Sequence, residues 1–151
     1  MSVANLDFLL NEPEQLRQLL QAAKTVAVVG LSSDPRRPSH GVASVLMQYG
    51  YEIYPVNPQE QNVHGRPAVP ELARVPVKID IVDLFRRSSE VGPHVDEAIA
   101  IGAKAVWMQD GVIDEAAALR AHRAGLAVVM DRCMARDLFR YFGSPPLPGR
   151  G

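Results

Sequence analysis

Short apolar runs alternate with segments of helical periodicity along most of the chain. The run Thr25-Val-Ala-Val-Val and four later runs of similar length are typical of strands covered on both faces, which are almost continuously apolar. Between these runs, apolar residues recur every three or four positions, as they do on the buried face of a helix. The pattern predicts strands at about 25–29, 52–56, 79–84, 103–108 and 126–130, and helices at about 12–23, 40–49, 88–101, 113–124 and 134–142.

Polar residues, prolines and glycines mark the ends of these elements. Asn11 is a candidate N-cap of the first helix, and Ser88 or Ser89 is expected to open the third. The stretch 59–76 contains several prolines and predicts a short additional strand and one helical turn. Residues 143–151, rich in glycine and proline, are expected to form a frayed, flexible tail.

Strands separated by helices predict parallel βαβ units, because a parallel pair needs a crossover connection and that crossover is right-handed. The expected fold is therefore a three-layer, Rossmann-like α/β fold with a doubly wound, mostly parallel sheet. The 151 residues, 47% apolar and 22% charged, suit one hydrophobic core. We expect a single domain over residues 1–151, with its core at about 12–140.

A doubly wound sheet binds ligands outside the carboxyl ends of its strands, where the strand order reverses. Segments that follow four different strands should therefore meet at one cleft, although they lie far apart in the sequence. These segments are residues 30–40, 57–58, 85–87 and 109–111.

The first of these segments has the chemistry of a phosphate-binding loop. Gly30 allows the backbone to turn sharply after the strand, and the free N–H groups of the following helix attract anions. Ser32 and Ser33 can donate hydrogen bonds, while Arg36 and Arg37 carry charge that matches phosphate geometry. This loop predicts a phosphorylated, nucleotide-like ligand.

The loop differs from the dinucleotide fingerprint G-x-G-x-x-G, because the glycine after Gly30 comes only at Gly41. The acidic residue that would bind an adenosine ribose after the second strand is replaced by Asn57 and Pro58. A neutral residue there suits a ligand with phosphate on its ribose better than it suits NAD. Spacing leaves both NADP and coenzyme A (CoA) open.

Several segments resemble the small bacterial CoA-binding proteins, stand-alone domains similar to the CoA-binding domain of the succinyl-CoA synthetase alpha subunit. The resemblance covers about residues 12–140, and it favours CoA over NADP. The segments that carry it are Val28-Val-Gly-Leu-Ser-Ser, Arg37-Pro-Ser-His, Tyr54-Pro-Val-Asn-Pro, Ile81-Val-Asp-Leu-Phe-Arg-Arg, Ala100-Ile-Gly-Ala-Lys-Ala-Val-Trp and Val129-Met-Asp-Arg-Cys.

The resemblance implies a position for each part of the ligand. The nucleotide would lie along the loop after the first strand, the adenine beside the turn after the second, and the pantetheine beside the end of the fourth. The residues implied are Gly30, Ser32, Ser33 and Arg36 for the nucleotide, Asn57 and Pro58 for the adenine, Phe85 and Arg86 for the pantetheine, and Met108, Gln109 and Asp110 for a further CoA contact.

The chain departs from the synthetase at two points of this site. Ser33 replaces a glycine of the loop, and Gln59-Glu60 stands where the synthetase has a lysine. The sequence also shows no counterpart of the synthetase domain with the phosphorylated histidine, so we expect binding of CoA or an acyl-CoA without catalysis and no catalytic residue. The alternatives are an NADP-dependent oxidoreductase-type domain, or a protein-interaction module with a vestigial nucleotide cleft.

Charge and composition exclude several other classes. A net charge of −1 argues against nucleic-acid binding, which needs a basic surface. No apolar run approaches the roughly 20 residues that span a bilayer, and the first residues lack a signal-peptide pattern. Histidines 64, 94 and 122 are too widely spaced to predict a metal site. A cytoplasmic protein is expected, and the single cysteine fits a reducing compartment.

That cysteine, Cys133, follows the last predicted strand and precedes the last helix. A thiol at a helix N-terminus can have a lowered pKa, and Arg132 would assist. Two interpretations stay open: a small buried residue, or a thiol that forms a mixed disulfide with CoA.

Overall fold

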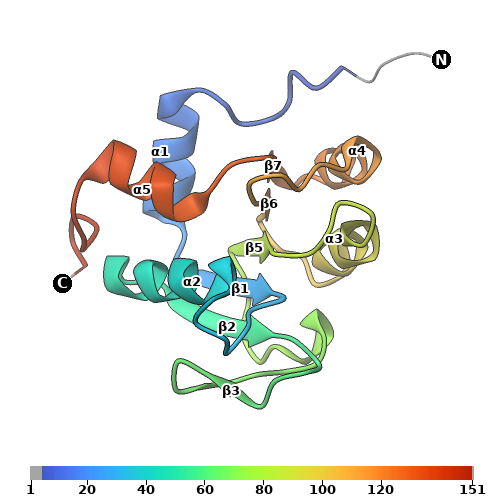
Figure 1. The fold of residues 1–151 in the computed structure, drawn as a ribbon. Helices are drawn as coiled ribbons and strands as arrows, with labels where there is room; N and C mark the ends of the chain where they lie inside the picture. The colour runs from blue at the N-terminus through green and yellow to red at the C-terminus, as the bar shows by residue number, and fades with distance from the viewer. Residues whose placement is uncertain (1–4, 151) are drawn as a thin grey trace.

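A five-stranded, fully parallel sheet lies between two layers of helices in the computed structural model, which describes residues 5–150 (Figure 1). The strand order β2-β1-β5-β6-β7 confirms the predicted doubly wound α/β fold, with the reversal between β1 and β5. The strands are β1 (Thr25–Val29), β2 (Glu52–Val56), β5 (Ile81–Leu84), β6 (Ala105–Met108) and β7 (Ala127–Val129).

Alternating side chains of the strands divide the core in two. Val26 and Val28 pack toward α1 (Pro13–Ala22), α2 (Pro38–Tyr49) and α5 (Met134–Phe142). Ala27 and Val29 pack toward α3 (Val91–Ala100) and α4 (Glu115–Arg123) on the other face (Figure 1). Residues 26–29 of β1 are thus apolar and buried on both sides, as the sequence predicts. None of the helices within residues 5–150 is long and apolar enough to cross a membrane.

Helix starts are where the sequence prediction errs most. α1 begins after Glu12 rather than Asn11, because Glu12 and Gln15 form a reciprocal capping box. α2 begins at Pro38, two residues earlier than expected, since proline is well suited to the first helical position. α3 begins only after Glu90, so neither predicted serine caps it.

Residues 59–76 form a hairpin and a short helix, so the predicted helical turn is confirmed, but two short strands replace the one that the sequence predicts. The hairpin pairs β3 (Asn62–Val63) with β4 (Arg66–Pro67) in a separate two-stranded sheet. The 3-10 helix η1 (Leu72–Arg74) follows and buries Leu72. The turn that connects β2 to this hairpin places residue 60 beside the loop after β1.

The C-terminal tail differs from the expected frayed end over residues 143–150. Leu147 is 1% exposed, and its N–H donates to the carbonyl of Tyr49 at 3.2 Å. The guanidinium of Arg150 donates to the carbonyl of Gln21 and lies over the ring of Tyr51. These contacts attach the proline-rich segment to the core.

Candidate functional site

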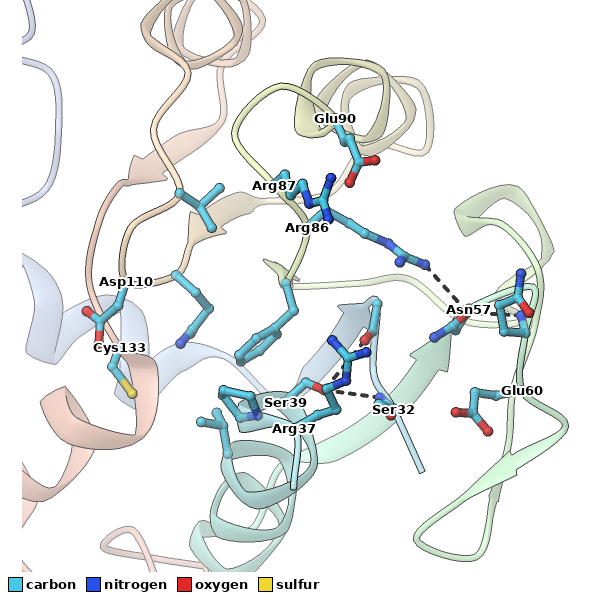
Figure 2. A pocket seen from close by; sticks show the side chains of 17 residues that line it. Ser32, Arg37, Ser39, Asn57, Glu60, Arg86, Arg87, Glu90, Asp110 and Cys133 are labelled. Carbon is cyan, nitrogen blue, oxygen red and sulfur yellow. Dashed lines mark hydrogen bonds between the residues drawn. The ribbon is translucent and has the colours of Figure 1, made fainter. Parts of the chain in front are cut away.

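A pocket of about 860 Å³ opens at the carboxyl ends of β1, β2, β5 and β6 (Figure 2). Its volume falls in the range of small-molecule sites, about 300–1,000 Å³. All four segments that topology predicted to meet contribute to its lining. The predicted residues that line it are Gly30, Ser32, Asn57, Phe85, Arg86, Gln109 and Asp110.

The floor of the pocket is a close approach between the ends of β1 and β5. Gly30 has a φ of 86°, and a Cβ atom placed there would lie 2.3 Å from the carbonyl oxygen of Phe85. The neighbouring N–H of Phe85 donates to the carbonyl of Val29 at 2.9 Å, so the two backbones are held together. Strand packing at the pocket floor therefore requires glycine at position 30, independently of any contact that Gly30 makes with a ligand.

Internal hydrogen bonds hold the loop after β1. The Ser39 hydroxyl, 3% exposed, accepts a hydrogen bond from the N–H of Ser32 at 3.0 Å. From the β2 turn, the Asn57 amide donates to the carbonyl of Leu31 at 3.0 Å. Ser39 was not among the predicted residues; its position directly after Pro38, at a helix start, is the signal that could have identified it. These contacts fix the loop in one conformation before any ligand binds.

The two arginines of this loop have different positions. Arg36 forms an ion pair with Asp34 at 3.1 Å and its side chain is 89% exposed, outside the pocket lining. This pairing lowers the pKa of Asp34. Arg37, the N-cap of α2, lines the pocket instead. Of the two candidate arginines, the structure places Arg37 in the pocket lining and Arg36 outside it, and contact of Arg36 with the nucleotide stays a prediction.

Ser33 faces a carboxylate across the loop. Its N–H and its hydroxyl both donate to Oε2 of Glu60, at 2.8 and 3.0 Å. These two hydrogen bonds lower the pKa of Glu60. Glu60 lines the pocket, whereas Ser33 does not. The two positions at which the sequence departs from the resemblance are thus in direct contact.

Three cationic side chains line the middle of the pocket: Arg37 from the α2 side, and Arg86 and Arg87 from the loop after β5 (Figure 2). Within residues 5–150 none of them forms an ion pair. Arg86 donates only a long hydrogen bond, 3.4 Å, to the side-chain oxygen of Asn57. Their charges are therefore available to an anionic ligand.

The far end of the pocket lies between β6 and α5. Gln109, 4% exposed, accepts the N–H of Met134 at 3.2 Å and so connects the strand end to the helix start. Asp110 pairs with Arg136 at 2.7 Å, which lowers the pKa of that carboxyl. Cys133, the N-cap of α5, lines the pocket beside them (Figure 2).

Two other predicted residues lie outside the lining. Met108 is fully buried in the core beneath α3 and α4, because it alternates with Gln109 on the strand. Pro58 forms the turn after β2. Arg132, expected to assist Cys133, instead holds the buried carboxylate of Asp137 at 2.7 Å. No group of three or more metal-ligating side chains occurs in the described part of the chain.

Residues 24–138 match the family described as CoA binding domain. A curated relative, YneT of Bacillus subtilis (strain 168), is 38% identical over 120 residues, which make up 80% of this chain and 89% of that protein. The alpha subunit of acetate–CoA ligase (ADP-forming) II of Pyrococcus furiosus is 26% identical over 120 residues, or 72% of this chain. The chain spans only 26% of that subunit's length.

The fold also matches solved structures over nearly its whole length. A hypothetical protein from Pyrococcus horikoshii OT3 is 36% identical, with a TM-score of 0.87 that covers 95% of this chain and 100% of that one. The sheet and its helices therefore have the same arrangement as in that protein.

Proposed function

The chain belongs to the CoA binding domain family, and on this premise we propose that the pocket at the strand ends binds CoA or an acyl-CoA reversibly, without catalysis of its own. The observation that carries the proposal is the distribution of chemistry along the lining. Arginines that have no ion-pair partner among residues 5–150 gather where the loop after β1 meets β5, and Phe85 and Cys133 lie toward β6 and α5. CoA has a matching distribution of charge, with phosphates at one end and an uncharged, thiol-bearing arm at the other.

Isothermal calorimetry with CoA, dephospho-CoA, NADP and NAD tests this proposal. CoA should bind most tightly, because the pocket offers several cations and no acidic residue directly at the end of β2. Equal affinities for CoA and dephospho-CoA would remove the argument from the 3′-phosphate. Preferential binding of NADP, together with oxidation of NADPH at 340 nm by a candidate substrate that accepts the hydride, would instead establish an oxidoreductase. A pocket that binds none of the four would favour an interaction module.

Arg37→Ala should weaken CoA binding by about 1.5–3 kcal/mol, or roughly ten- to a hundredfold, because one charge-assisted phosphate contact is lost. Arg36→Ala is the matched control, since it removes the same charge from the neighbouring position outside the lining. Both variants should melt near the wild-type temperature, as exposed loop charges contribute little to folding. Equal losses of affinity in the two variants would mean that Arg37 has no specific contact.

Cys133 should form a mixed disulfide with CoA when the protein is incubated with CoA disulfide. Its thiolate would attack one sulfur of the disulfide, bond to it and release the other CoA as a thiolate. The reason is position, because Cys133 lines the pocket at the start of α5, whose N-terminus favours negative charge. Intact-protein mass spectrometry should show one added CoA on the wild type and none on Cys133→Ser. An unmodified wild type would leave reversible binding alone.

A further inference from the structure

A carboxylate of the protein, that of Glu60, lies at the point of the pocket edge where the phosphate of a ligand would be expected. Glu60 follows the turn after β2, where its N–H donates to the carbonyl of Asn57 at 3.2 Å. Its carboxylate reaches the loop after β1, 27 positions away in the sequence, and lines the edge of the pocket (Figure 2).

The groups that Glu60 holds are those with which a protein binds phosphate. A backbone N–H and a hydroxyl of Ser33 both donate to one carboxylate oxygen, at 2.8 and 3.0 Å. A phosphate oxygen at this point would accept the same two hydrogen bonds. The same bonds lower the pKa of Glu60, so its carboxylate is charged at neutral pH.

The charge of Glu60 is not neutralised by a cation. Three arginines line the same pocket, yet Glu60 takes part in no ion pair within residues 5–150. A carboxylate whose role was to brace the pocket would gain more from one of these guanidinium groups than from a serine. Its negative charge therefore remains directed at the space that a phosphorylated ligand would enter.

We propose that Glu60 lowers the affinity of this pocket for phosphorylated ligands, because its carboxylate occupies the donors of Ser33 in the free protein and adds a like charge beside the ligand. This inference rests on the proposed binding of CoA. Glu60 must move aside, or remain as a like charge beside the ligand, and either outcome lowers the affinity. The pocket would then hold CoA more loosely than its arginines alone would allow, which suits reversible binding.

Glu60→Gln tests the inference with little change of shape. The glutamine amide can still accept a hydrogen bond from Ser33, but the negative charge is gone. CoA should bind at least about fivefold more tightly, the factor that corresponds to Coulomb repulsion between two unit charges 4 Å apart in bulk water. This gain should shrink at about 1 M salt, where the screening length is only about 3 Å. Calorimetry at low and high salt measures both effects.

Glu71→Gln is the matched control, because Glu71 is an exposed carboxylate at the start of η1, outside the pocket lining. It makes the same change of net charge and should leave CoA affinity unchanged. Glu60→Ala, which removes the hydrogen bonds as well, should bind CoA at least as tightly as Glu60→Gln. Thermal melts would verify that each variant is folded.

The outcomes separate this inference from the function on which it rests. If the wild type binds CoA and Glu60→Gln binds it equally or more weakly, Glu60 supports the loop and the inference is wrong, while the proposed function stands. A gain shared by Glu71→Gln, or one that salt does not reduce, would also overturn the inference. If no variant binds CoA at either salt concentration, both proposals fall.

Discussion

Replacing Asp83 with valine should raise the free energy of unfolding at neutral pH by about 1–3 kcal/mol, the cost of a buried polar group without partners. Asp83 lies in β5, the central strand, opposite Val28 and Trp107, and is completely buried. Neither of its carboxylate oxygens has a hydrogen-bond partner within residues 5–150. Valine supplies an apolar side chain that suits a strand covered on both faces.

The effect should depend on pH with a definite sign. Burial raises the pKa of Asp83 well above its ordinary value of 3.8. At pH values below 3.8, Asp83 is protonated in both the folded and the unfolded protein, so its carboxyl has its smallest effect on stability. As the pH rises above about 4, the unfolded chain releases the proton while the folded protein keeps it, and the wild type loses stability until the raised pKa is reached. The advantage of Asp83→Val should therefore grow with pH over this window.

Urea unfolding of wild type, Asp83→Val and Asp83→Asn across this pH window measures the prediction. Asparagine removes the ionisable group but leaves polar atoms buried, so it should abolish the pH-dependent part and recover less stability than valine. Other carboxyls whose pKa values are lowered, such as those of Asp34 and Asp110, contribute equally to all three proteins. The differences in stability between the three proteins therefore report on residue 83. A difference between wild type and valine that stays constant with pH would show that Asp83 does not carry a raised pKa.

Gly30→Ala should destabilise the protein by about 2–5 kcal/mol, the combined cost of a left-handed backbone with a side chain and of overpacking. The added methyl group would lie 2.3 Å from the carbonyl oxygen of Phe85, a backbone atom fixed by the β1–β5 ladder. Because the strand ends would have to separate, the pocket floor should change and CoA affinity should fall as well.

Gly41→Ala is the natural comparison for this variant. Gly41 lies inside α2, and a Cβ atom added there would meet no neighbouring group within 4 Å outside the adjacent helix backbone. Alanine at this position should therefore stabilise the helix by about 0.5–1 kcal/mol. Chemical denaturation of the two variants should thus give changes of opposite sign. If Gly30→Ala unfolded at the wild-type denaturant concentration, the close approach of β1 and β5 would not be essential.

The sequence alone was sufficient for the parallel order of strands and helices and for the edge of the sheet at which a pocket forms. Buried parallel strands are apolar on both faces, so runs such as residues 25–29 are recognisable without any contact being known. The convergence of the four loops follows from topology, because the carboxyl ends of parallel strands lie at one edge. Helix starts depend on single caps and were predicted less well.

Tertiary structure decided which side chains face the pocket. Arg36 and Arg37 are equivalent in the sequence, but in the structure Arg36 pairs with Asp34 outside the lining while Arg37 lies in it. Ser33 and Glu60 meet because the turn after β2 lies beside the loop after β1, which no local pattern predicts. Local periodicity determines the elements, since each residue's neighbours in the chain set its backbone preference. The chemistry of the pocket instead depends on side-chain pairs far apart in the sequence, whose partners are known only once the layers have packed.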